Sequence, residues 1–152
     1  MAVYWNLGLV AQTEEQAEAC AEFFSRKELI LGEQRVPLDV SRGKGLDGWL
    51  VCVWPRGMSY GSPKGNDPRL TADDARVKIA GVFDAWLREA PVFKAAYFGG
   101  EAFDRFLDEP ISEIVGVDGL VVDEATWISL GRPSEAQLAA PARFEWRRSR
   151  VT

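Results

Sequence analysis

The stretch from Gly48 to Trp54 restricts the fold more than any other part of the chain. The six residues after the glycine are all apolar, namely Trp49, Leu50, Val51, Cys52, Val53 and Trp54. β-Branched and aromatic residues favour an extended backbone, and an uninterrupted apolar run is typical of a strand buried on both faces. Such a strand needs neighbouring strands and a layer of apolar side chains against it, which the rest of the chain must supply.

Further strands are predicted where short β-prone segments lie between turn signals, at residues 3–10, 34–40, 92–98 and 120–122. Pro37 interrupts the second of these segments. Because proline has no N–H to donate to a neighbouring strand, we expect this strand at an edge of the sheet. Turns are predicted at residues 41–45, at Gly99-Gly100 and at Asp118-Gly119.

Two long helices are predicted from their capping residues and apolar spacing. Thr13 and Gln16 have the spacing of a capping box, which starts a helix that ends near Lys27. Thr71 and Asp74 have the same spacing and start the longest helix. Its apolar residues recur at helical intervals, so one face of the helix should pack against the sheet.

Shorter helices are predicted at residues 101–108 and 124–130, the second capped by Asp123 and followed by Gly131. The order of elements predicts an α+β fold, with a single mainly antiparallel sheet covered by helices on one side. A length of 152 residues fits one domain, so we expect residues 1–152 to form a single unit.

The two cysteines and the apolar segments suggest a cytoplasmic protein. Cys20 lies in a predicted helix and Cys52 in a predicted strand, and both have apolar neighbours, so we expect free, buried thiols rather than a disulfide. The first ten residues have no basic region of the kind that begins a signal peptide. No apolar run approaches the length of a membrane span.

Enzymatic chemistry has little support in this sequence, which contains no histidine. Serine and cysteine triads that use histidine are therefore excluded, and the common zinc sites lack their ligands. No phosphate-binding glycine motif occurs. We predict that the protein is not an enzyme and binds no metal or cofactor. The remaining alternative is a carboxylate pair, Glu101 and Asp104, because two suitably placed acids suffice for glycoside cleavage.

Acidic residues gather in one segment, from Glu101 to Glu124. Eight acids and one base, Arg105, give this segment a charge of −7, whereas the whole chain carries −5. Three readings stay open: a solvated acidic face, a docking surface for a basic protein, and a calcium site, although the usual calcium-loop spacing is missing. We predict partner binding by Glu101, Asp104, Asp108, Glu109, Asp118 and Asp123. The C-terminal arginines would neutralise the negative charge of this surface if they lay against it.

Tyr60 is the aromatic candidate for the same interface. It lies in the long segment 55–70, which is rich in Gly, Pro, Ser and Asn and also contains Arg56, Met58 and Lys64. Long segments of this composition are often binding loops, and aromatic, methionine and arginine side chains are enriched at protein interfaces. The alternative is a loop that folds back and buries Tyr60.

The segment from Gly119 to Pro133 resembles a known family. It reads Gly-Leu-Val-Val, two acids, Trp127, Leu130 and Gly131, and the aromatic pair Phe144 and Trp146 follows near the C-terminus. This pattern resembles the small immunity proteins of bacterial polymorphic-toxin systems, and the Imm52-like group is the nearest. The resemblance implies a protein that binds and neutralises a cognate toxin, in that group a nuclease of restriction-endonuclease type.

The expected partner is therefore a cognate toxin or effector protein that is basic or binds nucleic acid. The chain itself is expected to bind neither nucleic acid, which its net negative charge repels, nor a membrane. A non-catalytic regulatory or scaffold module is the alternative. It would bind a peptide or small ligand in a groove, with segment 55–70 as a lid.

Overall fold

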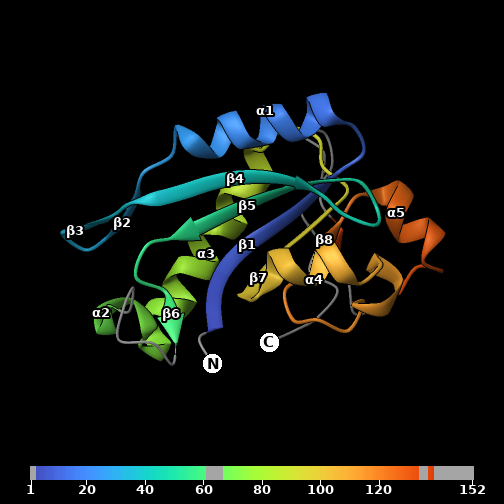
Figure 1. The fold of residues 1–152 in the computed structure, drawn as a ribbon. Coiled ribbons are helices and arrows are strands. Elements are labelled where there is room, and N and C mark those ends of the chain that lie inside the picture. Colours follow the sequence, from blue (N-terminus) through green and yellow to red (C-terminus); the bar gives the residue numbers. More distant parts are fainter. Residues whose placement is uncertain (1–2, 61–66, 134–136, 139–152) are drawn as a thin grey trace.

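Strand β1 (Val3–Ala11) lies at the centre of the main sheet in the computed structural model, which describes residues 3–60, 67–133 and 137–138. It pairs antiparallel with β5 (Trp49–Pro55) on one side and with β7 (Ala95–Gly100) on the other. Figure 1 shows β1 running between them. The apolar run of β5 is thus an interior strand, as predicted.

Shorter strands extend the sheet on both sides. The edge strand β4 (Leu38–Lys44) pairs antiparallel with β5, and β8 (Val121–Val122) pairs antiparallel with β7. Strand β9 (Gln137–Leu138) runs parallel to β8, and β6 (Ser59–Tyr60) pairs with the first residues of β1. The order is therefore β4-β5-β1-β7-β8-β9, and the predicted α+β fold with a mainly antiparallel sheet is confirmed.

One face of the sheet is covered by the two long helices, α1 (Glu14–Ser25) and α3 (Asp73–Glu89). Because side chains alternate along a strand, Leu7 and Leu9 of β1 point to this face and pack with Phe24 of α1 and Phe83 of α3. The apolar residues predicted to face the sheet from the longest helix include Ile79, Phe83 and Leu87, and all three are buried.

Helices also cover part of the opposite face of the sheet, in addition to the one covered side that we expected. Helix α4 (Ala102–Asp108), the short 3-10 helix η1 (Ile111–Glu113) and α5 (Glu124–Ser129) lie on this side. The second core contains Val10, Leu50, Ala95, Tyr97, Ala102, Phe106, Ile111, Ile114, Leu120 and Val122. The sheet is therefore the middle layer of the molecule near α4 (Figure 1).

The capping predictions have different outcomes. Thr13 caps α1, with its Oγ1 accepting from Gln16 N at 3.2 Å, as predicted. Thr71 does not cap the longest helix, because α3 follows Ala72 and has no side-chain cap. Thr71 instead ends the short helix α2 (Pro68–Thr71), which Asp67 caps by accepting from Arg69 N.

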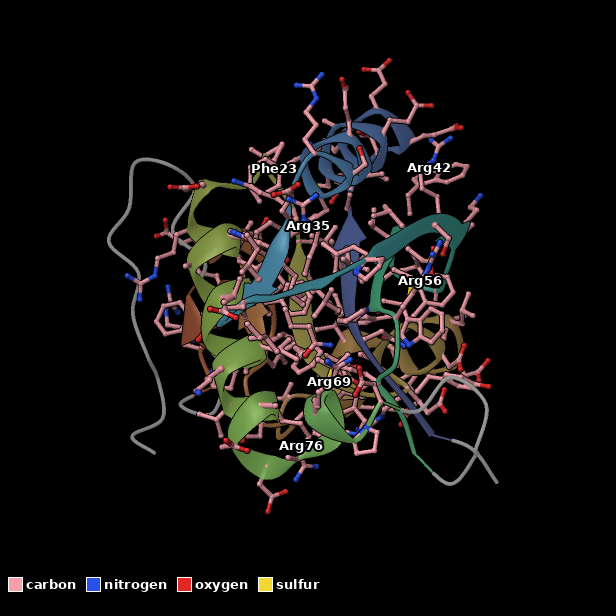
Figure 2. The ribbon with its side chains drawn as sticks, turned by 90° about the vertical axis from the view of Figure 1, so that its left-hand side faces the viewer. Phe23, Arg35, Arg42, Arg56, Arg69 and Arg76 are labelled. Atoms are coloured by element: carbon pink, nitrogen blue, oxygen red, sulfur yellow. The ribbon has the colours of Figure 1, made fainter. Side chains whose placement is uncertain are left out.

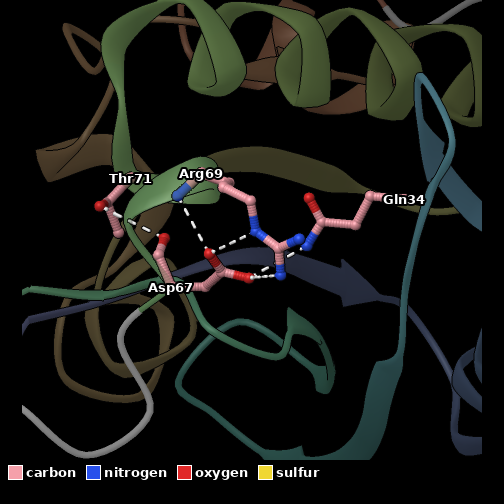
Figure 3. Close-up of polar contacts among 4 residues, drawn as sticks. All are labelled: Gln34, Asp67, Arg69 and Thr71. Carbon is pink, nitrogen blue, oxygen red and sulfur yellow. Dashed lines mark hydrogen bonds and ion pairs between the residues drawn. The ribbon is translucent and has the colours of Figure 1, made fainter.

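Asp67 is the centre of the polar network around α2 in Figure 3. Its carboxylate also accepts from Gln34 Nε2 at 3.0 Å, and its backbone carbonyl accepts from Thr71 Oγ1. Gln34 belongs to β3 (Gln34–Val36), which forms a hairpin with β2 (Leu29–Leu31). This network joins the hairpin to α2, so a polar residue in the predicted loop has a structural role.

Two predicted turns are wrong. Gly99 and Gly100 belong to β7, where they pair with Asn6 and Trp5, and the chain turns instead at Glu101, whose φ is 56°. The turn expected at 41–45 begins later, because β4 continues to Lys44. The strand expected over 34–40 is divided at Pro37 into β3 and the edge strand β4. The turn at Gly119 is confirmed by its φ of 80°.

Segment 55–70 is only in part the predicted loop. It contains β6 and α2, and residues 61–66, with Lys64 among them, lie outside the described residues, as does the whole of 139–152 with Phe144 and Trp146. Met58 is fully buried in the first core, which contradicts its reading as an interface anchor. None of the described helices is long and apolar enough to span a membrane.

Candidate functional site

Helix α4 is held directly against the sheet by two residues of β1. Asn6 is 6% exposed, and its Oδ1 accepts a hydrogen bond from Phe103 N at 2.9 Å. This acceptor satisfies one of the free N–H groups in the first turn of α4, where Glu101 provides no side-chain cap. At Gly8, a Cβ atom would lie 2.9 Å from the Ala102 carbonyl carbon, so only glycine allows this close approach. The acids of α4 are therefore presented on a rigid support.

Beside α4, the same face of the sheet is hollowed over a volume of about 320 Å³. Strands β1, β4 and β5 and the first turn of α4 all contribute to it. The lining residues that matter chemically are three acids, Asp39, Glu101 and Asp104, and three aromatic rings, Tyr4, Trp54 and Phe103. We call this feature the acidic hollow. In the described part of the chain, no basic side chain lines it.

Glu101 forms the corner of the acidic hollow. Its backbone N–H donates to the Tyr4 carbonyl at 2.8 Å, and its Oε1 accepts from Tyr4 N at 3.1 Å. Its φ of 56° is the left-handed conformation, which is uncommon for a residue other than glycine and costs energy. These contacts fix the carboxylate at the end of the β1–β7 ladder.

Burial raises the pKa of the Glu101 carboxyl, and a hydrogen bond with the Asp104 side chain raises this pKa further. From the sequence alone, neither acid has an evident reason for a raised pKa. A bound cation beside these two acids would favour the ionised form of Glu101.

Aromatic rings form the apolar part of the hollow. Tyr4 is 41% exposed, and its ring meets Trp54 edge to face at 5.7 Å between centroids. The ring of Phe103 lies over Gly43 of β4, where a Cβ would be 3.1 Å from Cζ. The exposed ring of Tyr4, with the half-buried rings of Trp54 and Phe103 beside the carboxylates, is suited to the aliphatic stem and the charged end of a lysine or arginine side chain.

The basic residues of the described chain are spread out and mostly paired. Figure 2 labels five arginines that come from different parts of the fold, and each forms an ion pair with an acid. The pairs are Arg35–Glu28, Arg42–Glu18, Arg56–Asp39, Arg69–Asp67 and Arg76–Asp73. Arg56 holds Asp39 with two hydrogen bonds of 2.8 Å and lowers the pKa of that carboxyl. Among the described residues, no basic side chain forms an ion pair with Glu101 or Asp104.

The other residues predicted to bind a partner are placed elsewhere or engaged locally. Glu109 is the C-cap residue of α4 and accepts from Arg105 Nε at 2.8 Å, and this contact lowers the pKa of the Glu109 carboxyl. Asp108 lies at the C-terminal end of α4. Asp123 caps α5 by accepting from Thr126 N at 2.8 Å, and Asp118 lines a different cleft beside β7. The fold therefore unites only Glu101 and Asp104 from the predicted set in one hollow.

Tyr60 pairs with Val3 at the end of β1, so its backbone is part of the sheet rather than of a loop. Its side chain lies outside the described part, and its role as an anchor stays a prediction. The segment that resembles the immunity proteins is largely structural where it is described. Leu120, Val121 and Val122 are fully buried, and Trp127 Nε1 donates to the Pro133 carbonyl at 3.0 Å.

Cys52 is the thiol of the acidic hollow. It is partly exposed, and burial raises its pKa to about 11, with smaller contributions from Asp104 and Asp39. Cys20 of α1 is fully buried in the first core, as expected, and burial raises its pKa to about 12. Both thiols are free, and neither is activated as a nucleophile, because the thiolate is the reactive form.

Sequence reasoning missed the contributions of β1, β4 and β5 to the hollow. The sequence did contain a signal for β4, because polar Asp39 and Ser41 alternate with apolar Val40. Such alternation indicates a strand with one face that is not fully covered by apolar side chains. The polar Asn6 and the small Gly8 in an otherwise apolar β1 marked the contact with α4 in the same way. The described residues contain no cluster of His, Cys, Asp and Glu side chains that would hold a metal ion.

Comparisons with protein-family models, with curated proteins and with solved structures found no match for this chain.

Proposed function

We propose that this protein is a binding protein of the immunity type, which docks a basic surface of a toxin in the acidic hollow and does no chemistry of its own. One observation carries the proposal. Glu101 and Asp104 form a carboxyl pair that lacks a cationic partner among the described residues, beside the exposed ring of Tyr4 and on a rigidly held helix.

The charge arrangement favours a cationic partner. Most described arginines are already bound to acids, whereas Glu101 and Asp104 form no ion pair with a described base, and Asp104 contributes to the raised pKa of Glu101. A lysine or arginine placed between the two acids would favour the charged form of Glu101 and gain charge-assisted hydrogen bonds. Asp39 adds a third acid at the rim, although Arg56 already balances its charge.

The shape favours a protein over a small molecule. A volume of about 320 Å³ is at the lower end of the range for small-molecule sites, roughly 300–1,000 Å³, which are usually enclosed. Here the rim residue Tyr4 is 41% exposed and Asp104 is exposed, so the hollow opens broadly to solvent. This shape suits an anchor residue projecting from a larger partner surface.

The toxin class rests on the sequence resemblance in segment 119–133. A nuclease carries a basic surface to hold the phosphate backbone, and an acidic inhibitor that covers this surface also blocks its substrate. The acidic chain would then be steered to the toxin by charge. We expect association to slow steeply with added salt, because exposed charges are screened over about 8–10 Å at ordinary ionic strength.

Co-expression tests the immunity function. The toxin candidates are proteins encoded next to the gene for this chain, expressed in a bacterial host from an inducible promoter. We expect cells to survive induction when this protein is present and to die when it is absent. Survival should be lost with Glu101→Gln/Asp104→Asn and kept with Glu113→Gln/Glu124→Gln, which removes the same charge from the same acidic segment. Death of cells that express both proteins, for every neighbouring candidate, would contradict the immunity function.

A further inference from the structure

Strand β4 has an outer edge that no described strand pairs with. Hydrogen bonds from Arg56 N to the Pro37 carbonyl and from Gly45 N to the Gly48 carbonyl mark the two ends of the β4–β5 ladder. The register between these ends is continuous, and backbone groups alternate in direction along a strand, so the odd-numbered residues of β4 face β5. Those that point away from the sheet belong to Leu38, Val40, Arg42 and Lys44. In the described chain these N–H and C=O groups have no backbone partner, and we call them the open edge of β4.

The open edge borders the acidic hollow. Side chains alternate between the two faces of a strand, and those of Asp39 and Ser41 line the hollow. On the other face, Val40 packs against the first core and Arg42 forms an ion pair with Glu18 of α1. Figure 1 shows β4 at the edge of the sheet, next to α1. A strand added to β4 would therefore place every second side chain beside the hollow.

We propose that the toxin adds an extended segment to the open edge of β4 and directs a lysine or arginine of that segment into the acidic hollow. This inference rests on the proposed function and specifies how the partner docks. Unpaired N–H and C=O groups along an edge strand are the groups that an added strand satisfies. Backbone hydrogen bonds would supply affinity for any extended segment, and the hollow would select a basic side chain at one position of it.

The position of α4 favours a long basic side chain. The Phe103 ring lies over Gly43 of β4, so the first turn of α4 reaches across the sheet toward the open edge. Asp104 follows Phe103 in this turn and lines the same hollow. Lysine and arginine carry their charge at the end of a long stem, which can lie against the Phe103 ring while the charge approaches Asp104. On the opposite face the segment would meet Arg42, so we expect uncharged residues there.

A second copy of this chain fits the open edge less well. Pairing two β4 strands about a two-fold axis would bring two acidic hollows side by side, and like charges repel. A basic segment of the toxin meets complementary charge instead.

Amide hydrogen exchange measured by NMR tests the proposal, because β4 carries its own control. The isotope-labelled chain is measured alone and in complex with the neighbouring-gene protein that it neutralises on co-expression. In the free chain, the outward-facing amides of Val40, Arg42 and Lys44 should exchange rapidly, whereas those of Ser41 and Gly43 are protected by pairing with β5. Complex formation should slow exchange of the three outward-facing amides by at least about tenfold.

A backbone substitution separates strand pairing from side-chain contacts. Arg42→Pro and Arg42→Ala both remove the ion pair with Glu18, and only proline also removes the outward-facing N–H. Because this N–H does not point to β5, proline is compatible with the edge position. We expect Arg42→Pro to bind the same neighbouring-gene protein at least about tenfold more weakly than Arg42→Ala does. If Arg42→Pro does not fold, the exchange measurement on the unaltered chain decides the matter.

Unchanged exchange at Val40, Arg42 and Lys44 in a tight complex would overturn the strand addition and leave the immunity function standing. Equal affinities of the folded Arg42→Pro and Arg42→Ala variants would do the same. Outward-facing amides that are already protected in the free chain would show that a second copy or another segment occupies the edge, which also contradicts the proposal. If this chain neutralises no neighbouring-gene protein, the proposed function fails and the strand addition fails with it.

Discussion

Glu101 and Tyr4 hold each other through two hydrogen bonds, one from the backbone N–H of Glu101 to the Tyr4 carbonyl at 2.8 Å and one from Tyr4 N to Glu101 Oε1 at 3.1 Å. The side-chain oxygen stands where a backbone carbonyl would continue the antiparallel ladder. The same carboxyl meets Asp104 in the acidic hollow. Glu101 therefore stabilises the fold through its hydrogen bond with Tyr4 and contributes negative charge to the acidic hollow. Different substitutions of Glu101 can test these two roles separately.

We expect Glu101→Gln to keep the fold and Glu101→Ala to weaken it. The amide oxygen of glutamine still accepts from Tyr4 N, whereas alanine leaves this donor without its partner, at a cost of about 1 kcal/mol in the free energy of unfolding. Urea unfolding followed by tryptophan fluorescence measures the difference. Equal stability of the two variants would show that the contact with Tyr4 contributes nothing. The glutamine variant is accordingly the right one for binding experiments.

Gly8→Ala should lower the free energy of unfolding by about 1–3 kcal/mol, because its methyl group would overlap the backbone of Ala102 and displace α4. Gly81→Ala is the matched substitution. It places a methyl group on α3 where no atom lies within 4 Å, and it should stabilise the protein by about 0.5–1 kcal/mol through helix propensity. Chemical denaturation of both variants checks the opposite signs, and a neutral Gly8→Ala would mean that α4 does not need the close contact.

These two glycines also show what the sequence reveals and what it does not. The strand at Val3–Ala11, the Thr13 cap and the apolar face of α3 are local patterns, and the predictions from them are confirmed. The meaning of Gly8 depends on Ala102, which is distant in the chain. Local periodicity carries no information on which helix will approach a strand.

The candidate site, like the fold, could be predicted only in part from the sequence. The acidic segment led to Glu101 and Asp104, because charge density is visible in the sequence. It did not separate them from Asp123, a helix cap, or from Glu109, which Arg105 binds. Trp54 belongs to the hollow only because β5 pairs with β4 and β1, and strand order cannot be read from one sequence.

Partner binding should weaken as the pH falls, because the Glu101 pKa is raised and its carboxyl protonates before an ordinary glutamate does. The neutral acid attracts a cation less, so affinity should decrease as the pH falls, and the decrease should begin at a higher pH than for an ordinary glutamate. The sign for stability is opposite. A raised acid pKa in the folded state favours folding at low pH, and this contribution is lost as the pH rises through that pKa. Titration calorimetry at several pH values checks the binding, and Glu101→Gln should flatten the dependence.

Cys52 should react slowly with iodoacetamide and Cys20 more slowly still. With a pKa of about 11, only about one Cys52 thiol in a thousand is ionised at pH 8, and Cys20 is fully buried in the first core, where the reagent does not reach it. Mass spectrometry of peptides after timed alkylation measures both rates, which should rise with pH up to the respective pKa. Rapid modification of Cys52 at neutral pH would show that the thiol is activated and that the hollow has a chemical role.

The affinity of charge-matched variants for the toxin identified by co-expression tests the central claim most directly. Glu101→Gln/Asp104→Asn and Glu113→Gln/Glu124→Gln have the same net charge and differ only in whether the changes lie in the acidic hollow. We predict that the hollow variant binds at least about tenfold more weakly than the unaltered protein, equivalent to about 1.4 kcal/mol, and that the other changes affinity by less than about twofold. Equal weakening by both would reduce the effect to overall charge, and unchanged affinity of the hollow variant would contradict docking in the acidic hollow.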